Sequence, residues 1–413
     1  MSYWKGLGCF NAHASRNGLL TESAPNPLRR VCYITFAHIT VDFYMTLFPP
    51  LLALFATRFG LSLVEASLLP MTISVFGNMP QPMMGYLGDK NNRMILAALG
   101  VFCCGLFVSI IGFAPSAPVL ALFLVFAALG SSLFHPTGGG LVTASLPGRS
   151  NLAMAIFLTG GPLGMAIAPV AGTQIIQRYG LEQLWITVFP AIVAAAFLLR
   201  FSRSGNLGES TTKPVRISLA FLKTSEVRPL WTLFAISVFR SFVHATYISF
   251  ISFLGQSRGW NISEIGWTLS AYLVCITMGR IVGGYLGDRI SPRKLLGASC
   301  GISACFFIPF CFTTGVYSLV LFFLAGFIFD LGATTNIVLA QKVLPQNTST
   351  ATGMVMGFSW GVGGILMPFV ALLADATSIS VALAAVSSLL LPAALLVGAL
   401  PKIRPQSLSQ AGG

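Results

Sequence analysis

The chain has 413 residues, of which 55% are hydrophobic and only 8% are charged. Soluble domains carry roughly 25% charged residues, so this composition excludes an ordinary soluble enzyme and indicates an integral membrane protein. The net charge of +13 does not point to a nucleic-acid partner, because the basic residues are spread over many short segments rather than gathered in one patch.

Long apolar stretches recur along the chain, and each can cross a ~30 Å hydrocarbon core. A segment surrounded by lipid must satisfy its own backbone N–H and C=O groups, which favours α-helices. The first six expected spans cover residues 30–56, 64–88, 94–113, 117–143, 150–178 and 184–203. The second six cover residues 229–255, 262–287, 294–314, 317–344, 350–376 and 378–402. The sequence therefore predicts an all-α membrane protein with twelve transmembrane helices in two six-helix bundles.

These spans divide the chain into two bundles, 30–203 and 229–402, with a linker at 204–228, an N-terminal segment at 1–29 and a tail at 403–413. Cytoplasmic loops are rich in Lys and Arg. Nineteen of the 24 basic residues lie on the side of the two termini, whereas Arg58, Arg178 and Arg258 lie on the other side. We therefore expect a multi-pass plasma-membrane protein, in a bacterium the inner membrane, with both termini in the cytoplasm.

The two halves repeat a short motif. Residues 85–89 read Gly-Tyr-Leu-Gly-Asp, and the same five residues stand 199 positions later at 284–288. Each copy ends the second span of its half and leads into basic residues. Another correspondence sets Met154, Gly161 and Gly164 in the fifth span 200 positions before Met354, Gly361 and Gly364. Internal repeats of this size are how many transporter folds are built, so the bundles should be pseudo-symmetric.

The repeated motif resembles the signature loop of the major facilitator superfamily, G-x-L-x-D-R/K-x-x-x-R/K. In that superfamily the loop is a conformational latch rather than a substrate site, so the resemblance implies a latch in each half. Its residues here are Gly85, Gly88, Asp89, Lys90 and Arg93, and in the second copy Gly284, Gly287, Asp288, Arg289 and Arg293. We expect each Asp to cap a neighbouring helix or to pair with a basic residue across the interface of the halves.

A narrower resemblance covers the first five spans. Residues 38–44, His-Ile-Thr-Val-Asp-Phe-Tyr, and 48–52, Phe-Pro-Pro-Leu-Leu, are similar to the first helix of the fosmidomycin resistance protein family. Gln81-Pro82 and Phe134-His135-Pro136 fit the same family, which implies proton-coupled drug efflux. Residues 137–140 read Thr-Gly-Gly-Gly where relatives often carry an acidic residue after the His-Pro pair. The substrate and the direction of transport therefore stay open.

The fifth span contains Gly160-Gly161-Pro162-Leu163-Gly164, which partly resembles the glycine-proline motif of superfamily exporters. Small residues in membrane helices also serve simply to let helices approach closely. We assign Gly161, Pro162 and Gly164 a structural role, and the resemblance favours export over import.

Ionisable residues at membrane depth are costly, so each is a functional candidate. The sequence offers seven, namely His38, Asp42, His135, Arg240, His244, Arg280 and Asp330. Six lie in the first, fourth, seventh and tenth spans, which line the central cavity in the superfamily fold; Arg280 lies in the eighth. We expect the six to handle protons or line the substrate cavity, and we read Arg280 as structural, pairing with the latch or with carbonyl groups.

Two pairs in this set are spaced four residues apart and so share a helical face. These are His38 with Asp42 and Arg240 with His244. We expect them to face each other across the cavity, with Arg240 balancing the charge of Asp42 or holding an anionic solute. His titrates near neutral pH, which suits it to carrying protons.

Each of these residues also has a plain structural alternative. Asp42 can be a fixed partner of His38 or Arg240, and His135 can be a packing residue. Asp330 can bridge the nearby Thr334 and Thr335.

The sequence predicts a secondary transporter rather than an enzyme, because it has no phosphate-binding glycine loop followed by Lys-Ser/Thr and no hydrolase motif. The favoured function is proton-coupled efflux of a drug-like or anionic solute by a monomer that needs no cofactor and no bound metal. Alternatives are proton-coupled uptake of a metabolite or an iron chelate, a divalent-metal carrier, and a membrane receptor or scaffold without transport activity.

Overall fold

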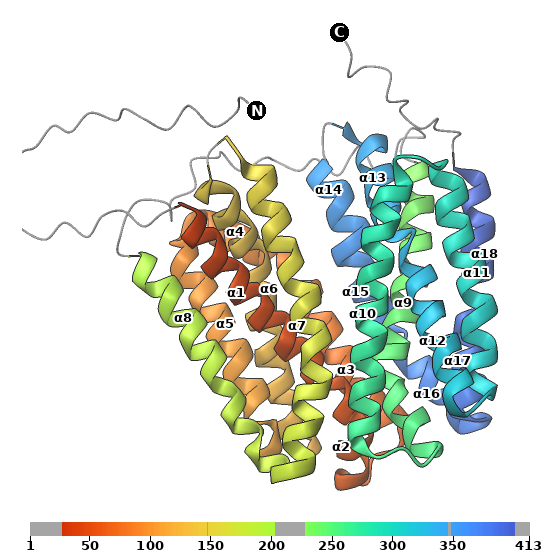
Figure 1. The fold of residues 1–413 in the computed structure, drawn as a ribbon. Helices are drawn as coiled ribbons and strands as arrows, with labels where there is room; N and C mark the ends of the chain where they lie inside the picture. The colour runs from red at the N-terminus through yellow and green to blue at the C-terminus, as the bar shows by residue number, and fades with distance from the viewer. Residues whose placement is uncertain (1–26, 147, 203–227, 346–347, 401–413) are drawn as a thin grey trace, which may run out of the picture.

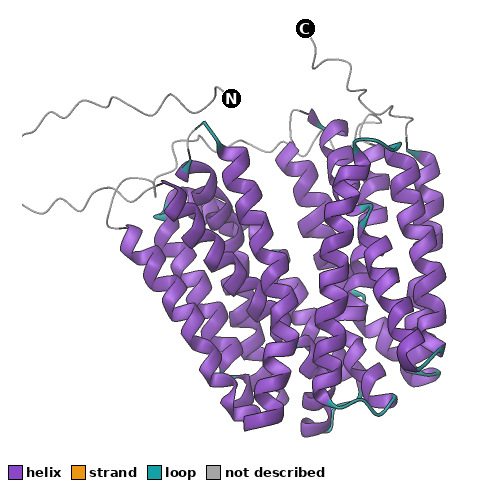
Figure 2. Ribbon diagram, viewed as in Figure 1, coloured by secondary structure: helices purple, strands orange, loops and turns teal. Residues whose placement is uncertain are grey.

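The computed structural model describes residues 27–146, 148–202, 228–345 and 348–400. Within these ranges the chain is helical and its helices are joined by short turns (Figure 2). The expected N-terminal segment, the linker and the C-terminal tail lie almost entirely outside the described residues.

The first half supplies six membrane-crossing segments, some of them interrupted. They are α1 (Pro27–Leu47) with η1 (Pro49–Leu51) and α2 (Leu52–Phe59); α3 (Leu63–Asn78) with α4 (Gln81–Lys90); α5 (Arg93–Ser109), followed by the short η2 (Ile111–Phe113); α6 (Ala117–Ser145); α7 (Ser150–Tyr179); and η3 (Leu181–Thr187) with α8 (Val188–Ser202).

The second half supplies six more. They are α9 (Arg228–Ser257); α10 (Ile262–Gly287); α11 (Pro292–Phe312); α12 (Gly315–Asp330) with α13 (Ala333–Val343); α14 (Thr348–Gly353) with the π-helical η7 (Met354–Phe358), α15 (Ser359–Ile365) and α16 (Met367–Ala376); and α17 (Ile379–Ser388) with α18 (Leu390–Leu396) and η8 (Val397–Ala399). Ten of the twelve segments are long and apolar enough to span a membrane, and α5 is a shorter apolar helix. The remaining segment is broken between α3 and α4, where Pro80 interrupts it.

The repeat seen in the sequence is present in the structure. The second segment of each half begins with a capping box, Ser62 with Glu65 and Asn261 with Glu264. In both, the glutamate carboxylate accepts the backbone N–H of the cap residue, at 2.8 Å and 2.7 Å. Capping boxes satisfy backbone donors that a helix start leaves free, so the two halves begin this segment in the same way.

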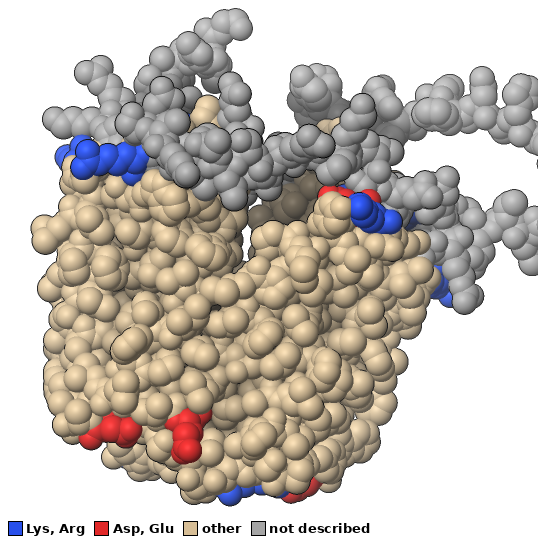
Figure 3. Space-filling model, turned by 180° about the vertical axis from the view of Figure 1, so that it is seen from behind, with Lys and Arg blue, Asp and Glu red and all other residues tan. Residues whose placement is uncertain are grey.

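Each half has its own hydrophobic core, and the two bundles meet along a limited interface. α7 packs against α10, α3 packs against α15 and α16, and η1 and α2 pack against α9. The halves join at the end where α2 and α3 meet α9 and α16, and they separate toward the opposite end, where α4 and α14 lie (Figure 1). A hollow between the halves is visible at the separated end from behind (Figure 3).

Glycines allow this contact between the halves. A Cβ built on Gly266 of α10 would overlap the hydroxyl of Thr173 on α7, and one built on Gly364 of α15 would overlap Ser74 on α3. Gly364 belongs to the repeat of the fifth span found in the sequence. Because it has no side chain, α15 and α3 of the two bundles can approach closely at this point.

The two latches lie at the separated end, where α4 and α10 finish. In the first copy Asp89 forms an ion pair with Arg93 of its own half, and Gly88 lies against Thr137 of α6. In the second copy Arg289 stacks on Tyr285, Arg293 donates to the carbonyl of Gly398, and Asp288 has no ion pair among the described residues. Of the two roles expected for each Asp, pairing across the interface is not seen among the described residues, because Asp89 pairs within its own half and the halves are apart at this end. The role of the latch residues stays a prediction.

Candidate functional site

The first cluster of ionisable residues lies inside the N-terminal bundle. Asp42 of α1 accepts contacts from two imidazoles: His38 Nε2 lies 3.4 Å from Oδ2, and His135 Nε2 of α6 lies 3.4 Å from Oδ1. Side-chain exposure rises from 8% for His38 to 16% for Asp42 and 26% for His135. No Lys or Arg contacts this carboxylate in the described part of the chain, so two imidazoles are its only ionisable partners.

The neighbouring helix α7 holds His38 in place. Its backbone carbonyl at Phe157 lies 2.8 Å from His38 Nδ1, and the Phe157 ring stacks on the imidazole at 4.1 Å. When Nδ1 donates to that carbonyl, neutral His38 presents the lone pair of Nε2 to Asp42. Gly161, one turn further along α7, lies directly against the Asp42 carboxylate. Two residues of α7 thus shape the cluster: the Phe157 carbonyl favours the His38 tautomer that is protonated at Nδ1, and Gly161 leaves room for the Asp42 carboxylate.

The second cluster lies inside the C-terminal bundle. Asp330, the last residue of α12, pairs with two guanidinium groups: Arg280 Nε of α10 lies 2.8 Å from Oδ2, and Arg240 Nη2 of α9 lies 3.6 Å from Oδ1. Arg240 also donates to the carbonyl of Phe329 at 2.7 Å and lies over the ring of that residue at 4.2 Å. Asp330 and Arg240 are buried, whereas 43% of the Arg280 side chain is exposed.

His244 lies beside this second cluster and forms no ion pair with any residue in the described ranges. Its ring packs against Phe329 and stands edge-on to Trp360 of α15, with centroids 5.1 Å apart. Tyr272 Oη lies 3.4 Å from its Nδ1. His244 is thus an aromatic packing residue with one weak hydrogen bond.

The two clusters occupy corresponding places but carry opposite charge. His38 and Asp42 lie on the first segment of their half, as Arg240 and His244 do in the other half, and His135 and Asp330 lie on the fourth segment of each half. The carboxylate of the first cluster, Asp42, lies on the first segment of its half, whereas that of the second cluster, Asp330, lies on the fourth segment of its half. With neutral imidazoles, the first cluster carries one negative charge, whereas the second carries one positive charge.

The structure brings together residues that the sequence did not connect. The expected contact between Asp42 and Arg240 is absent from the described residues, because each pairs within its own bundle. Arg280 pairs with Asp330 rather than with the latch, and Asp330 bridges two arginines rather than Thr334 and Thr335.

Phe157 and Trp360 were not singled out in the sequence. A buried aromatic in a segment rich in Phe gives no distinguishing signal, so only helix packing reveals their role beside the histidines. The end of α12 did carry a signal, because Gly332 follows Asp330 and glycine often marks a helix end.

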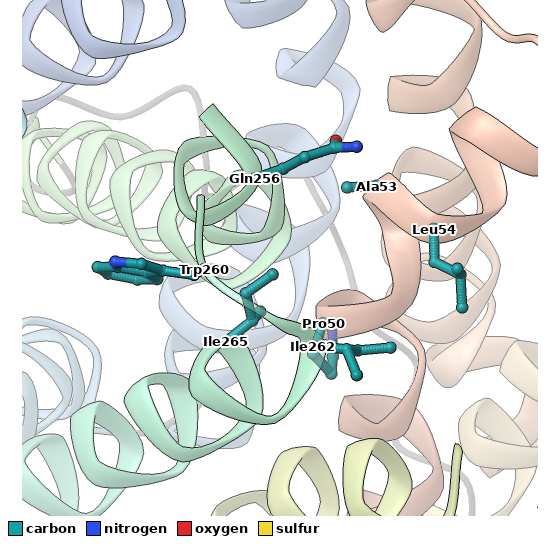
Figure 4. A pocket seen from close by; sticks show the side chains of 7 residues that line it. All are labelled: Pro50, Ala53, Leu54, Gln256, Trp260, Ile262 and Ile265. Carbon is teal, nitrogen blue, oxygen red and sulfur yellow. The ribbon is translucent and has the colours of Figure 1, made fainter. Parts of the chain in front are cut away.

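A pocket lies away from both clusters, at the end where the two halves join, which we call the closed end. It is lined by Pro50, Ala53, Leu54, Gln256, Trp260, Ile262 and Ile265 and sits between α2 and the turn from α9 to α10 (Figure 4). Apart from the indole N–H of Trp260, the polar lining side chain is Gln256, whose Nε2 lies 3.4 Å from Thr57 Oγ1. This pocket contains no ionisable group, so it is not a candidate for charge-dependent binding.

Comparison with known proteins agrees with this two-bundle arrangement. The family model of the Major Facilitator Superfamily matches residues 34–368 and 233–412. The chain belongs to the major facilitator superfamily. It is therefore a multi-pass membrane transporter of small-molecule solutes and not an enzyme, and the twelve-helix fold predicted from the sequence is confirmed.

Among relatives, the fosmidomycin resistance protein of Escherichia coli (strain K12) is 26% identical over 350 residues, covering 84% of this chain and 86% of the relative. The MFS-type transporter YfnC of Bacillus subtilis (strain 168) is 24% identical over 374 residues, covering 86% and 89%. The multidrug resistance protein MdtG of Salmonella typhi is 24% identical over 297 residues, covering 69% and 71%. The narrower resemblance found in the sequence is thus confirmed.

Solved structures share the fold. A bacterial homologue of the human lysosomal transporter Spinster, in an inward-facing and occupied conformation, has a TM-score of 0.77 at 18% identity, covering 91% of this chain and 97% of the other. A D-xylose–proton symporter has a TM-score of 0.74 at 13% identity, covering 93% and 100%.

Proposed function

We propose that this transporter exports a small drug-like organic solute from the cytoplasm and is driven by the proton gradient. The observation that carries the proposal is the first cluster, in which a carboxylate at membrane depth contacts two imidazoles and no Lys or Arg among the described residues. While both imidazoles are neutral, the negative charge of the carboxylate is not balanced by a positive charge. A proton supplies that charge, and imidazole binds and releases protons near neutral pH.

Alternating access can couple this proton to movement of the bundles. Burial disfavours the charged form of a group, whereas a nearby opposite charge favours it. Asp42 and His135 are partly exposed in this conformation, so closing the cavity over them changes their solvation. Protonation and the direction in which the cavity faces are then linked.

Orientation follows from the charged residues of the described loops. At the separated end these include Lys90, Arg93, Arg149, Arg289, Arg293, Lys294 and Lys342, whereas Arg58, Arg178 and Arg258 lie at the closed end. By the positive-inside rule the separated end faces the cytoplasm. We therefore place both termini in the cytoplasm of the inner membrane, and the conformation described here is open to the inside.

Export is supported by two relatives that are resistance proteins, the fosmidomycin resistance protein and the multidrug resistance protein MdtG. Two other functions remain candidates. One is proton-coupled uptake of a metabolite or iron chelate, which the same proton site can drive. The other is transport of a divalent cation, because His38, Asp42 and His135 each offer a ligand atom and these atoms lie within 4.8 Å of one another.

Two linked experiments separate these functions. The chain is expressed in a bacterial host that lacks its own exporters, and growth is tested against an antibiotic panel that includes fosmidomycin. Any compound to which it gives resistance is then followed in proteoliposomes under an imposed pH gradient, beside Zn²⁺ and Co²⁺. Proton-driven export predicts resistance and gradient-dependent flux of that compound; accumulation of the compound in cells, or flux of the metal ions alone, would contradict it.

A further inference from the structure

The second cluster contains one more positive charge than its carboxylate can balance. Asp330 is the only acidic residue in contact with Arg240 and Arg280 in the described ranges. His244 contributes an aromatic contact rather than an ion pair. Asp330 and Arg240 are buried and Arg280 is partly exposed, so a cluster with one unbalanced guanidinium attracts an anion at the exposed side of Arg280.

The two arginines differ in what else they contact. Arg240 is nearly saturated: besides Asp330 it donates to the Phe329 carbonyl, lies 3.4 Å from Ser299 Oγ and 3.5 Å from Cys300 Sγ, and covers the Phe329 ring. Arg280 uses only its Nε, and its two terminal nitrogens have no hydrogen-bond partner among the described residues. The free donors of the cluster therefore belong to Arg280.

Arg280 points away from the lipid. The exposed apolar residues Trp267, Val274, Met278, Ile281 and Tyr285 lie along one face of α10. At 3.6 residues per turn, Arg280 lies roughly 130° around the helix from the middle of that face. The 43% of its side chain that is exposed is therefore directed toward the interior of the protein.

The space next to Arg280 is open toward the separated end. Gly284 is one turn further along the same face of α10, and a Cβ built on it meets no atom within 4 Å. The helix ends at Gly287, about 10 Å from Arg280 at 1.5 Å per residue. A solute entering between the bundles can reach the guanidinium from this side.

Unpartnered polar atoms occur beyond the break in the helix that carries Asp330. Thr335 Oγ1 and Asn336 Oδ1 are buried and have no hydrogen-bond partner in the part of the chain that the structure describes. Buried polar groups are normally satisfied, and discontinuous helices form binding sites in other transporters. This second observation indicates that the neighbourhood of Asp330 accommodates a polar ligand.

We propose that Arg280 binds the acid group of the transported solute, which is a small organic anion such as a carboxylate or phosphonate. A guanidinium presents paired donors that match these groups. Asp330 holds Nε and thereby aims the two terminal nitrogens at the solute. Arg240 neutralises Asp330, so that Asp330 does not repel the anion. This inference rests on the proposed function and names its substrate class.

The test is equilibrium binding to the full-length chain in detergent. Phenylphosphonate and benzoate serve as probes, and benzamide and benzylamine serve as the neutral and cationic matches, with titration calorimetry as the readout. We expect the parent to prefer the anions. Arg280→Gln should weaken anion binding at least about tenfold, the scale of one lost charge-assisted contact, without affecting benzamide, and Arg280→Lys should restore part of it. Arg178→Gln, at an exposed arginine of the closed end, is the matched control.

Two results would overturn the proposal. One is a parent protein that binds benzamide as tightly as benzoate, which needs no variant and therefore does not depend on the folding of Arg280→Gln. The other is an Arg280→Gln variant that binds phenylphosphonate as the parent does. Because binding at equilibrium requires no gradient, failure of proton-driven flux in proteoliposomes would contradict the proposed coupling and leave this test unaffected.

Discussion

Gly161 of α7 lies directly against the carboxylate of Asp42 on α1. A Cβ at position 161 would overlap Asp42 Oδ2 and would come within 3.0 Å of His38 Nε2. The two helices approach this closely along a glycine-rich stretch, since Gly160 and Gly164 also face the backbone of α1. The glycines of this α7 motif thus leave the space that the first cluster occupies.

Gly161→Ala should therefore displace the Asp42 carboxylate from its two histidines. We expect gradient-driven flux to fall by about tenfold or more, because misplacing a reacting group by about 1 Å can cost on the order of 100-fold. Flux in proteoliposomes at equal protein content checks this. Gly139→Ala on α6 is the control, since a Cβ there meets nothing within 4 Å. Equal flux in both variants would show that the close approach does not matter for coupling.

Arg240 and Arg280 should differ in their effect on stability. Arg240→Ala leaves a cavity and removes one partner of a buried pair, which typically costs about 3–5 kcal/mol. Arg280→Ala removes a side chain that is 43% exposed, so we expect a clearly smaller loss. Thermal unfolding in detergent compares the two variants, and an equal or larger loss for Arg280→Ala would contradict the assignment of Arg240 as the structural partner.

How far the sequence predicts this site depends on whether a contact lies within one helix. Hydropathy is enough to place the spans, and a spacing of four residues is enough to place His38 beside Asp42. The partners contributed by other helices depend on how each helix is rotated and packed, which no local pattern specifies. The contact of His135 with Asp42 and the ion pair of Arg240 with Asp330 were therefore not predicted from the sequence. The sequence shows the glycines that permit these contacts, but it does not show which residues of the neighbouring helices they face.

The latches should affect the rate of conformational change rather than substrate affinity. Asp89 pairs with Arg93 at the separated end, and Asp288 occupies the equivalent place in the other half. We expect Asp89→Ala and Asp288→Ala to slow transport several-fold while the dissociation constant of the solute stays within about twofold, since neither residue is in either cluster. Flux and direct titration on the same preparations check this. An equal loss of affinity would place the latch residues in the binding site.

The orientation can be tested with a fusion reporter. Residue 215 lies in the expected linker, outside the described residues, and the positive-inside rule predicts a cytoplasmic location for this segment. Alkaline phosphatase fused after residue 215 should be inactive and green fluorescent protein at the same position should be bright. Fusions after Arg178 in the loop at the closed end should give the reverse result. Active phosphatase after residue 215 would contradict the topology.

The central claim is that Asp42 couples proton movement to transport, and Asp42→Asn tests it most directly. The amide keeps the size of the side chain but cannot bind and release a proton. In proteoliposomes, the variant should lose uphill flux under an imposed pH gradient and keep solute counterflow, which requires no net proton movement. If Asp42→Asn drives uphill flux as the parent does, Asp42 has a structural role, the coupling site lies elsewhere, and Asp330 becomes the next candidate.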